Sequence, residues 1–312
     1  MAADETMREK WQALGVKEVR EVWARNFEAE ISNLMLSVGA AGGARAIVAL
    51  DTEFPGFLYE TPRTGGKEAK YGALRSNVDK LSPIQLGIAV AGAEGAVRGV
   101  WCFNMCFDVD VDLHTEESVN FLRRAGINFV RHKKEGISSV DFGRRLRCPL
   151  LVGPLAPLWL TFSGDYDFGY LLKVLTIGTQ LPGAVALFDG MVSGYMPRRF
   201  DLQDMLTQGS LESLGTKFGI RRHGSAHTAG SDALLTLELY LKAREENVWL
   251  SSGEWAPWSA DASGMWNYNT WDSVWSSEAS DWNSNTWRIP SHTSEQNHGF
   301  NDPRTSQAAW LW

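Results

Sequence analysis

Apolar residues follow two different periods along the first 250 residues. Between positions 21 and 38 they return every three or four residues with charges between them, which predicts an amphipathic helix. Residues 46–50 form a continuous apolar run, which is typical of a strand covered on both faces. Residues 84–91 and 100–107 predict two further strands, and the glycine-containing turn between them indicates a hairpin.

Later segments alternate between strand and helix patterns. We expect one more strand at 158–162, and helices at 116–125, 139–147, 167–176, 210–218 and 231–246. Strands that come first and are followed by alternating strand and helix predict a mixed sheet with helices on its faces. The expected fold class is therefore α/β.

The composition changes after about residue 246. Residues 250–312 contain no lysine, two arginines, seven acidic residues and nine of the chain's 14 tryptophans. Within them, the pattern Trp-Asn-x-Asn-Thr-Trp occurs at 266–271 and again at 282–287. Such a segment has too few aliphatic residues for a core, so we expect a disordered tail. The expected organisation is an N-terminal extension at 1–20, a folded domain at 21–247, and a Trp/Ser/Asn-rich low-complexity tail at 248–312.

Charge and cysteine usage narrow the class of protein. The net charge of −7 argues against binding nucleic acid by bulk charge, so any such contact must be local, through metals or stacking. Cys102, Cys106 and Cys148 are an odd number without a disulfide pattern, which favours a reducing compartment. We interpret them as small core residues. The N-terminus lacks an apolar signal and no stretch is long enough for a membrane span, so we expect a cytoplasmic and nuclear protein with no membrane partner.

Candidate chemistry begins with two carboxylates at the end of the first predicted strand. Asp51 and Glu53 stand two residues apart, so both point to one face of the strand while Thr52 points to the other. Two anions held this close repel each other, and a bound cation relieves the repulsion. Taken alone, such a pair more often marks the end of a strand before a turn than a metal site.

Two later motifs add acidic residues and a histidine. Asp167 follows the strand at 158–162 and opens a helix, where a carboxylate either caps the helix or reaches a metal; Asp165 competes for that role. His227 and Asp232 would lie about 140° apart on a helix, so they converge only if His227 precedes it. Gly230 would permit that turn. An imidazole there suits a general base, because its pKa is ordinarily about 6.5.

The order of these motifs is that of a nuclease that hydrolyses phosphodiesters with two metal ions. Four carboxylates hold a pair of divalent cations about 3.5–4 Å apart in such sites. From about residue 21 to 246 the chain resembles the Caf-one (Pop-two) family, the deadenylase subunit of the Ccr–Not complex. The segments that carry the resemblance are 48–56, 75–79, 84–87, 166–171 and 227–232.

The resemblance implies a ribonuclease-H-like fold and 3′-to-5′ removal of poly(A) from messenger RNA. It implies Mg²⁺ or Mn²⁺ ligands at Asp51, Glu53, Asp167 and Asp232, with His227 as the general base. It also implies docking on the Not scaffold and pairing with the second nuclease of the complex. One departure stands out: the family commonly has a His-Ser-Gly run before the Tyr-Asp pair, whereas residues 162–165 here read Phe-Ser-Gly-Asp. Spacing is kept, so Asp167 remains the expected ligand, and the effect of Asp165 is open.

Other functions remain open at this point. A scaffold subunit would keep the fold and recruit other factors; the presence of all four carboxylates favours the enzyme. A DNA-directed exonuclease of the proofreading type would differ in its substrate. The tryptophan-rich tail either inserts its rings into pockets of an unknown partner, gaining avidity by repetition, or has no role.

Overall fold

Strand β2 (Ile47–Glu53) lies at the centre of the protein, and its first four residues are fully buried. The computed structural model describes residues 19–62, 64, 66–206 and 209–246. In it β2 pairs antiparallel with β3 (Gln85–Ala91) and parallel with β5 (Leu158–Thr161). A strand with neighbours on both edges and helices on both faces needs apolar residues throughout. The strand predicted from the apolar run is confirmed.

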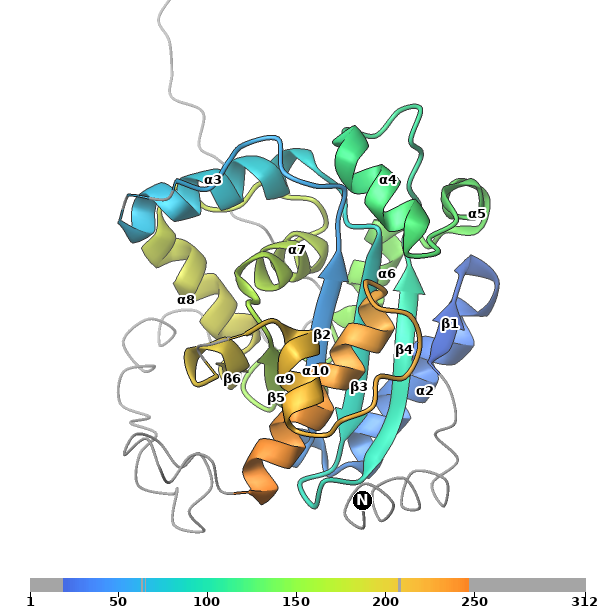
Figure 1. The fold of residues 1–312 in the computed structure, drawn as a ribbon, viewed down its shortest axis with the longest axis vertical. Helices are drawn as coiled ribbons and strands as arrows, with labels where there is room; N and C mark the ends of the chain where they lie inside the picture. Colours follow the sequence, from blue (N-terminus) through green and yellow to red (C-terminus); the bar gives the residue numbers. More distant parts are fainter. Residues whose placement is uncertain (1–18, 63, 65, 207–208, 247–312) are drawn as a thin grey trace, which may run out of the picture. The chain divides into compact units, whose positions relative to one another are not determined.

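The strands form one mixed sheet in the order β1-β4-β3-β2-β5-β6 (Figure 1). β1 (Arg20–Val22) pairs parallel with β4 (Val97–Asn104), and β4 pairs antiparallel with β3 as the predicted hairpin. β6 (Arg199–Asp201) pairs parallel with β5. The helices of the described part are α2 (Phe27–Ala40), α3 (Lys67–Lys80), α4 (Glu116–Arg124), α5 (Phe129–Glu135), α6 (Ser139–Leu146), α7 (Asp165–Leu175), α8 (Val185–Tyr195), α9 (Leu211–Lys217) and α10 (Ala229–Glu245).

Helices cover both faces of the sheet. In Figure 1, α10 crosses in front of β2 and β3, while α2 packs behind β3 and β4. Successive residues of β2 point alternately to these two layers: Ile47 and Ala49 join the apolar cluster with α10, whereas Val48 and Leu50 join the cluster with α2, α6 and α7. The sheet is therefore the middle of three layers, with an apolar core on each side.

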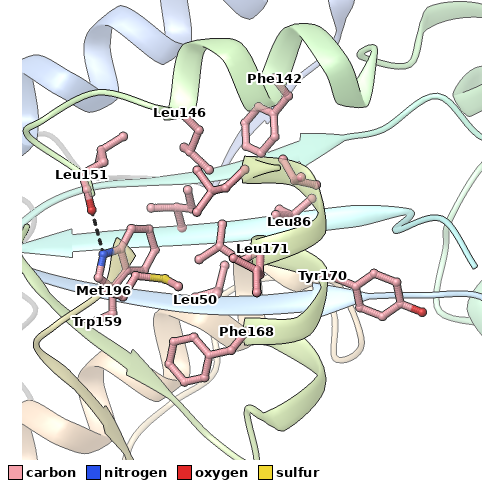
Figure 2. Close-up of a cluster of buried hydrophobic side chains, with 14 of the residues drawn as sticks. Leu50, Leu86, Phe142, Leu146, Leu151, Trp159, Phe168, Tyr170, Leu171 and Met196 are labelled. Carbon is pink, nitrogen blue, oxygen red and sulfur yellow. Dashed lines mark hydrogen bonds between the residues drawn. The ribbon is translucent and has the colours of Figure 1, made fainter. Parts of the chain in front are cut away.

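The larger core is packed between the sheet and α6 and α7 (Figure 2). Leu50 and Leu86 of the sheet lie against Leu171 of α7. At one end the indole of Trp159 donates a hydrogen bond of 2.9 Å to the carbonyl oxygen of Leu151. At the other end Tyr170 packs on Phe54, which follows Glu53 directly, with ring centroids 5.0 Å apart. The core thus reaches the end of β2 that carries the predicted carboxylates.

Two of the predictions are wrong in part. The helix expected from residue 21 begins only at Phe27, because Arg20–Val22 pair with β4 as an edge strand and a 3₁₀ turn at Ala24–Asn26 follows. The core interpretation of the cysteines holds for Cys102, which is buried in β4. Cys106 lies beyond the end of that strand and is exposed, and Cys148 is half-buried.

The expected α/β class, a mixed sheet flanked by helices, is confirmed. The tail at 248–312 lies outside the described residues, as does almost all of the extension at 1–20, so these two assignments stay predictions. Within the part of the chain that the structure describes, every helix is too short or too polar to cross a bilayer.

Candidate active site

The end of β2 sends its side chains to two helices. By the alternation of the strand, Asp51 and Glu53 share the face of Ile47 and Ala49, on which α10 packs. Thr52 points to the opposite face, where its hydroxyl donates a hydrogen bond of 2.5 Å to the Oδ1 atom of Asp167. One strand end therefore organises carboxylates from both layers.

Asp167 lies in the first turn of α7 and is only 6% exposed. The loop before that helix is held by Asp201, whose carboxylate accepts hydrogen bonds from the backbone N–H groups of Ser163 and Gly164 at 3.0 and 2.5 Å. Asp165, the competing acid, is the first residue of the same helix. Its carboxylate interacts electrostatically with Asp201 and with two lysines of α3. The hydrogen bond from the β2 strand thus goes to Asp167 and not to Asp165.

Two glycines bring the start of α10 onto the sheet. Gly87 of β3 pairs with Asp51, and a Cβ atom there would lie 1.8 Å from the carbonyl oxygen of Ala229. Gly230, in the first turn of α10, faces Cys102, and its own Cβ would lie 2.9 Å from the Cβ of that residue. Side chains at either position would push the helix away. Asp232 is carried on the same turn and is 7% exposed.

The buried side-chain amide of Gln85 forms a hydrogen bond with the backbone at the start of α10. The side-chain oxygen of Gln85 accepts a hydrogen bond of 3.2 Å from the N–H group of Ala229, one of the groups that a helix start leaves unpaired. The amide nitrogen of Gln85 donates to the side chain of Asn104 at 2.7 Å. Both residues are buried, so this pair fixes the helix start relative to β3 and β4.

His227 precedes α10, as its spacing from Asp232 requires. The turn is made by His227 itself, which has a left-handed backbone with φ of 59°. The expectation that Gly230 makes the turn is wrong, because that glycine is helical and serves close packing instead. His227, Glu53 and Asp232 each offer a ligand atom within 4.8 Å of the other two.

The carboxylates are held with little compensation for their charge. Burial, and then the charges of Asp167, Asp232 and Glu53, raise the pKa of Asp51 well above its ordinary value. Burial and the charges of Asp232 and Asp167 raise the pKa of Glu53 to about 8. Burial raises the pKa of Asp167 to about 7, although the hydrogen bond from Thr52 opposes the shift.

Arg222 is the cation nearest to this cluster in the described part of the chain. Its guanidinium donates hydrogen bonds to the carboxylate of Asp232 and, at 3.1 Å, to the hydroxyl of Ser231. Burial nevertheless outweighs its charge, and the pKa of Asp232 is raised. A cluster that keeps such raised pKa values needs more positive charge than one arginine supplies.

This arrangement fits divalent cations. Four carboxylates from β2, α7 and α10 lie close together, and two of them, those of Glu53 and Asp232, lie within 4.8 Å of a ring nitrogen of His227; oxygen-rich sites of this kind suit hard cations. Sequence reasoning did not identify Thr52, Gln85 or Arg222 as parts of the site. Their partners lie between 10 and 144 positions away along the chain, so the sequence alone does not show which residues they contact.

Aromatic rings border the cluster on the side of α7. Phe54 stacks on Tyr166 with centroids 5.3 Å apart, and Phe57 packs edge-on against both. Phe57 is 51% exposed, and Tyr59, in the same loop, is 40% exposed. The buried side chain of Asn77 holds this loop: its oxygen accepts hydrogen bonds from the N–H groups of residues 58 and 59. The exposed ring of Phe57 therefore lies next to Phe54 and Tyr166, the residues that flank Glu53 and Asp167.

The sheet order and its covering helices define a ribonuclease-H-like α/β protein with a carboxylate cluster at the end of its central strand. Comparisons with known proteins agree. The model of the CAF1 family ribonuclease matches residues 22–141. The poly(A) ribonuclease pop2 of Schizosaccharomyces pombe is 32% identical over 239 residues, which are 73% of this chain and 70% of the relative. The probable CCR4-associated factor 1 homolog 7 of Arabidopsis thaliana is 34% identical over 76% of this chain and 90% of its own.

Solved structures give the same result. The structure of S. pombe Pop2p with bound Mg²⁺ and Mn²⁺ superposes with a TM-score of 0.69 at 31% identity, over 74% of this chain and 94% of that one. Yeast CAF1, crystallised with the NOT1 MIF4G domain, superposes with a TM-score of 0.62 at 29% identity, over 74% of this chain and 89% of the matched chain. The chain belongs to the CAF1 ribonuclease family and is an exoribonuclease.

Proposed function

We propose that the enzyme removes poly(A) tails from messenger RNA in the 3′-to-5′ direction, releasing 5′-AMP. The observation that carries this proposal is the convergence of Asp51, Glu53, Asp167 and Asp232 in a chain of the CAF1 family, together with the names of relatives that are poly(A) ribonucleases. Mg²⁺ or Mn²⁺ are the proposed cations, since the S. pombe relative binds both.

Each residue of the cluster has a proposed role. Divalent cations held there would lower the pKa of a bound water and would stabilise charge on the phosphate and on the leaving 3′ oxygen. The four carboxylates hold and orient these charges, with Asp167 kept in place by Thr52. His227 takes the proton of the attacking water from the loop ahead of α10. The exposed rings of Phe57 and Tyr59 offer stacking surfaces for bases, worth roughly 1–3 kcal/mol each.

The activity is tested with purified protein and a 5′-labelled RNA that ends in a run of adenosines, in Mg²⁺ or Mn²⁺, beside Asp51→Ala. We expect a ladder of shortened products that stops at the non-adenosine body and is absent in the variant. The same RNA ending in uridines, and the same sequence as DNA, measure the substrate preference. DNA shortened as fast as RNA would identify a DNA-directed exonuclease instead.

We propose that the protein works within a Ccr–Not complex. One structural relative was crystallised with a NOT1 MIF4G domain, and a relative from Caenorhabditis elegans, 35% identical over 64% of this chain, is named as a subunit of the CCR4-NOT transcription complex. Such an assembly would place the enzyme in the cytoplasm and nucleus and beside the second nuclease. Co-purification of the chain with a recombinant MIF4G domain tests the contact, and failure to bind would contradict it.

A second candidate function is a catalytically weak scaffold subunit of the same complex. Binding to the MIF4G domain together with no RNA shortening under either cation, from folded protein, would establish that function. The tryptophan-rich tail at 248–312 is the proposed site for a further partner. Deleting residues 250–312 should leave shortening of pure RNA unchanged, and a large loss would refute this division of roles.

A further inference from the structure

His227 has a left-handed backbone conformation, which neighbouring residues must stabilise. A residue other than glycine at φ of 59° is in the sparsely populated left-handed region, and it keeps that conformation only where neighbours fix it. The side chain is exposed, so no surrounding core encloses it. Its imidazole instead packs edge-on against Phe121, with ring centroids 4.6 Å apart and planes at 65°.

Phe121 comes from α4, a helix far from α10 in sequence. Its side chain is 41% exposed. Val119 and Leu122 of the same helix are instead buried, in a separate apolar cluster with Phe107 and Phe129. Burial of the helix underside therefore fixes α4, while Phe121 is left on the side that meets His227. Phe121 therefore lies outside this apolar cluster, and its ring is available for the contact with His227.

The same helix is attached to the end of β2. The N–H group of Thr115, the residue that caps α4, donates a hydrogen bond of 2.9 Å to the carbonyl oxygen of Pro55, two residues after Glu53. Gly56 has φ of 101°, and a Cβ atom there would lie 2.2 Å from the hydroxyl of Thr115 and 2.4 Å from that of Ser118. Ser118 and Phe121 are three residues apart on the helix and so share a face. That face connects the strand end to the histidine.

We infer that Phe121 is a positioning residue that sets the location of the His227 imidazole relative to Asp51 and Glu53. The strand that carries the carboxylates fixes α4 through Pro55 and Gly56, and α4 fixes the imidazole through Phe121. The histidine loop is therefore positioned relative to the end of β2, the strand that carries Asp51 and Glu53. The inference rests on the proposed role of His227 as the general base.

The test compares the steady-state kinetics of Phe121→Ala and Phe121→Tyr on adenosine-tailed RNA. Loss of the ring frees the imidazole, and a displacement of about 1 Å costs up to about 100-fold in rate. We expect Phe121→Ala to lower kcat by about tenfold or more with KM unchanged, and Phe121→Tyr to restore it. Val130→Ala, which trims a 66% exposed side chain on the neighbouring helix α5, is the matched control and should change neither parameter.

A double-mutant cycle separates positioning from RNA binding. With His227→Ala already present, Phe121→Ala should cause no further loss of kcat, because the group that it positions is gone. An equal loss in both backgrounds would overturn the inference. So would a rise in KM at constant kcat, which would make Phe121 a stacking surface for RNA.

A spectroscopic measurement keeps the inference testable apart from activity. In protein labelled at histidine, the ring-proton resonances of His227, assigned by their loss in His227→Ala, should move and broaden in Phe121→Ala and stay in place in Val130→Ala. If wild-type protein does not shorten RNA but these resonances respond, the proposed function fails and the contact stands. Unchanged resonances in Phe121→Ala would contradict the contact itself.

Discussion

The hydroxyl of Thr52 donates a hydrogen bond of 2.5 Å to Oδ1 of Asp167, 115 residues further along the chain. Because Thr52 stands between Asp51 and Glu53, a single strand end carries two of the carboxylates and orients a third. Second-layer contacts of this kind commonly change metal affinity or activity by about 10–100-fold when they are removed.

Thr52→Val keeps the shape of the side chain and removes its hydroxyl. We expect the pKa of Asp167 to rise further and the Mg²⁺ concentration for half-maximal activity to increase by about 10–100-fold. Activity measured against Mg²⁺ concentration checks this. Thr179→Val, which removes an exposed hydroxyl bonded only to the backbone of its own loop, should leave the curve in place.

The metal-free protein should lose stability as the pH rises. Glu53 and Asp167 have pKa values of about 8 and about 7 in the fold, against ordinary values of 4.5 and 3.8. The folded state therefore holds protons that the unfolded chain releases, and the free energy of unfolding falls between about pH 4 and about pH 8. Thermal melts in chelator across this range measure the slope.

Divalent cations should reverse that slope, since they favour the charged carboxylates. The rise in melting temperature on adding Mg²⁺ should be larger at pH 8 than at pH 6. In Glu53→Gln the metal-free slope should be shallower. A metal-free protein whose melting temperature rises steadily from pH 5 to pH 8 would contradict the raised pKa values.

Arg222→Gln removes the cation that holds Asp232. We expect kcat to fall by about 10–100-fold, because the carboxylate loses its partner, and the metal-free protein to melt lower at pH 8, because the acidic cluster loses its counter-charge. Arg221→Gln makes the same change at an exposed neighbouring residue and serves as the control. Equal effects from the two variants would remove any special role from Arg222.

Gly87→Ala tests the close approach of α10. A methyl group would collide with the backbone of Ala229, so we expect a loss of about 1–3 kcal/mol in the free energy of unfolding and a fall in activity as Asp232 moves. Denaturant unfolding measures the first and RNA shortening the second. Gly39→Ala, in α2 with open space around it, should be neutral or stabilising by up to about 1 kcal/mol.

Periodicity predicted the elements that bury a clear apolar face. The strands at β2, β3 and β5 and the helices α4, α6, α7, α9 and α10 were all expected within a few residues of their observed bounds. Helix α3 was not, because its sequence is mostly polar and its few buried residues include Asn77, whose side chain holds a loop. The edge strands β1 and β6 are three residues each, too short for any pattern to show.

For the candidate site too, the sequence predicted some features correctly and others wrongly. Asp51, Glu53, Asp167, His227 and Asp232 stand in local motifs, and the sequence order alone suggested that they meet. The predicted turn at Gly230 is wrong, because the sequence does not show whether a glycine turns the chain or lets a neighbouring element pack closely. Here β4 packs against it, and that contact is set by the fold.

Whether the buried carboxylates hold the catalytic cations is tested most directly by Mn²⁺ binding. The measurement is calorimetry on metal-free protein at pH 8, wild type beside Asp51→Asn, with RNA shortening followed in the same samples. Two Mn²⁺ ions per chain are expected in the wild type, with at least one lost in the variant together with activity, while its circular dichroism is unchanged. Undiminished Mn²⁺ binding and activity in Asp51→Asn, or RNA shortening by the wild type in excess chelator, would contradict the assignment.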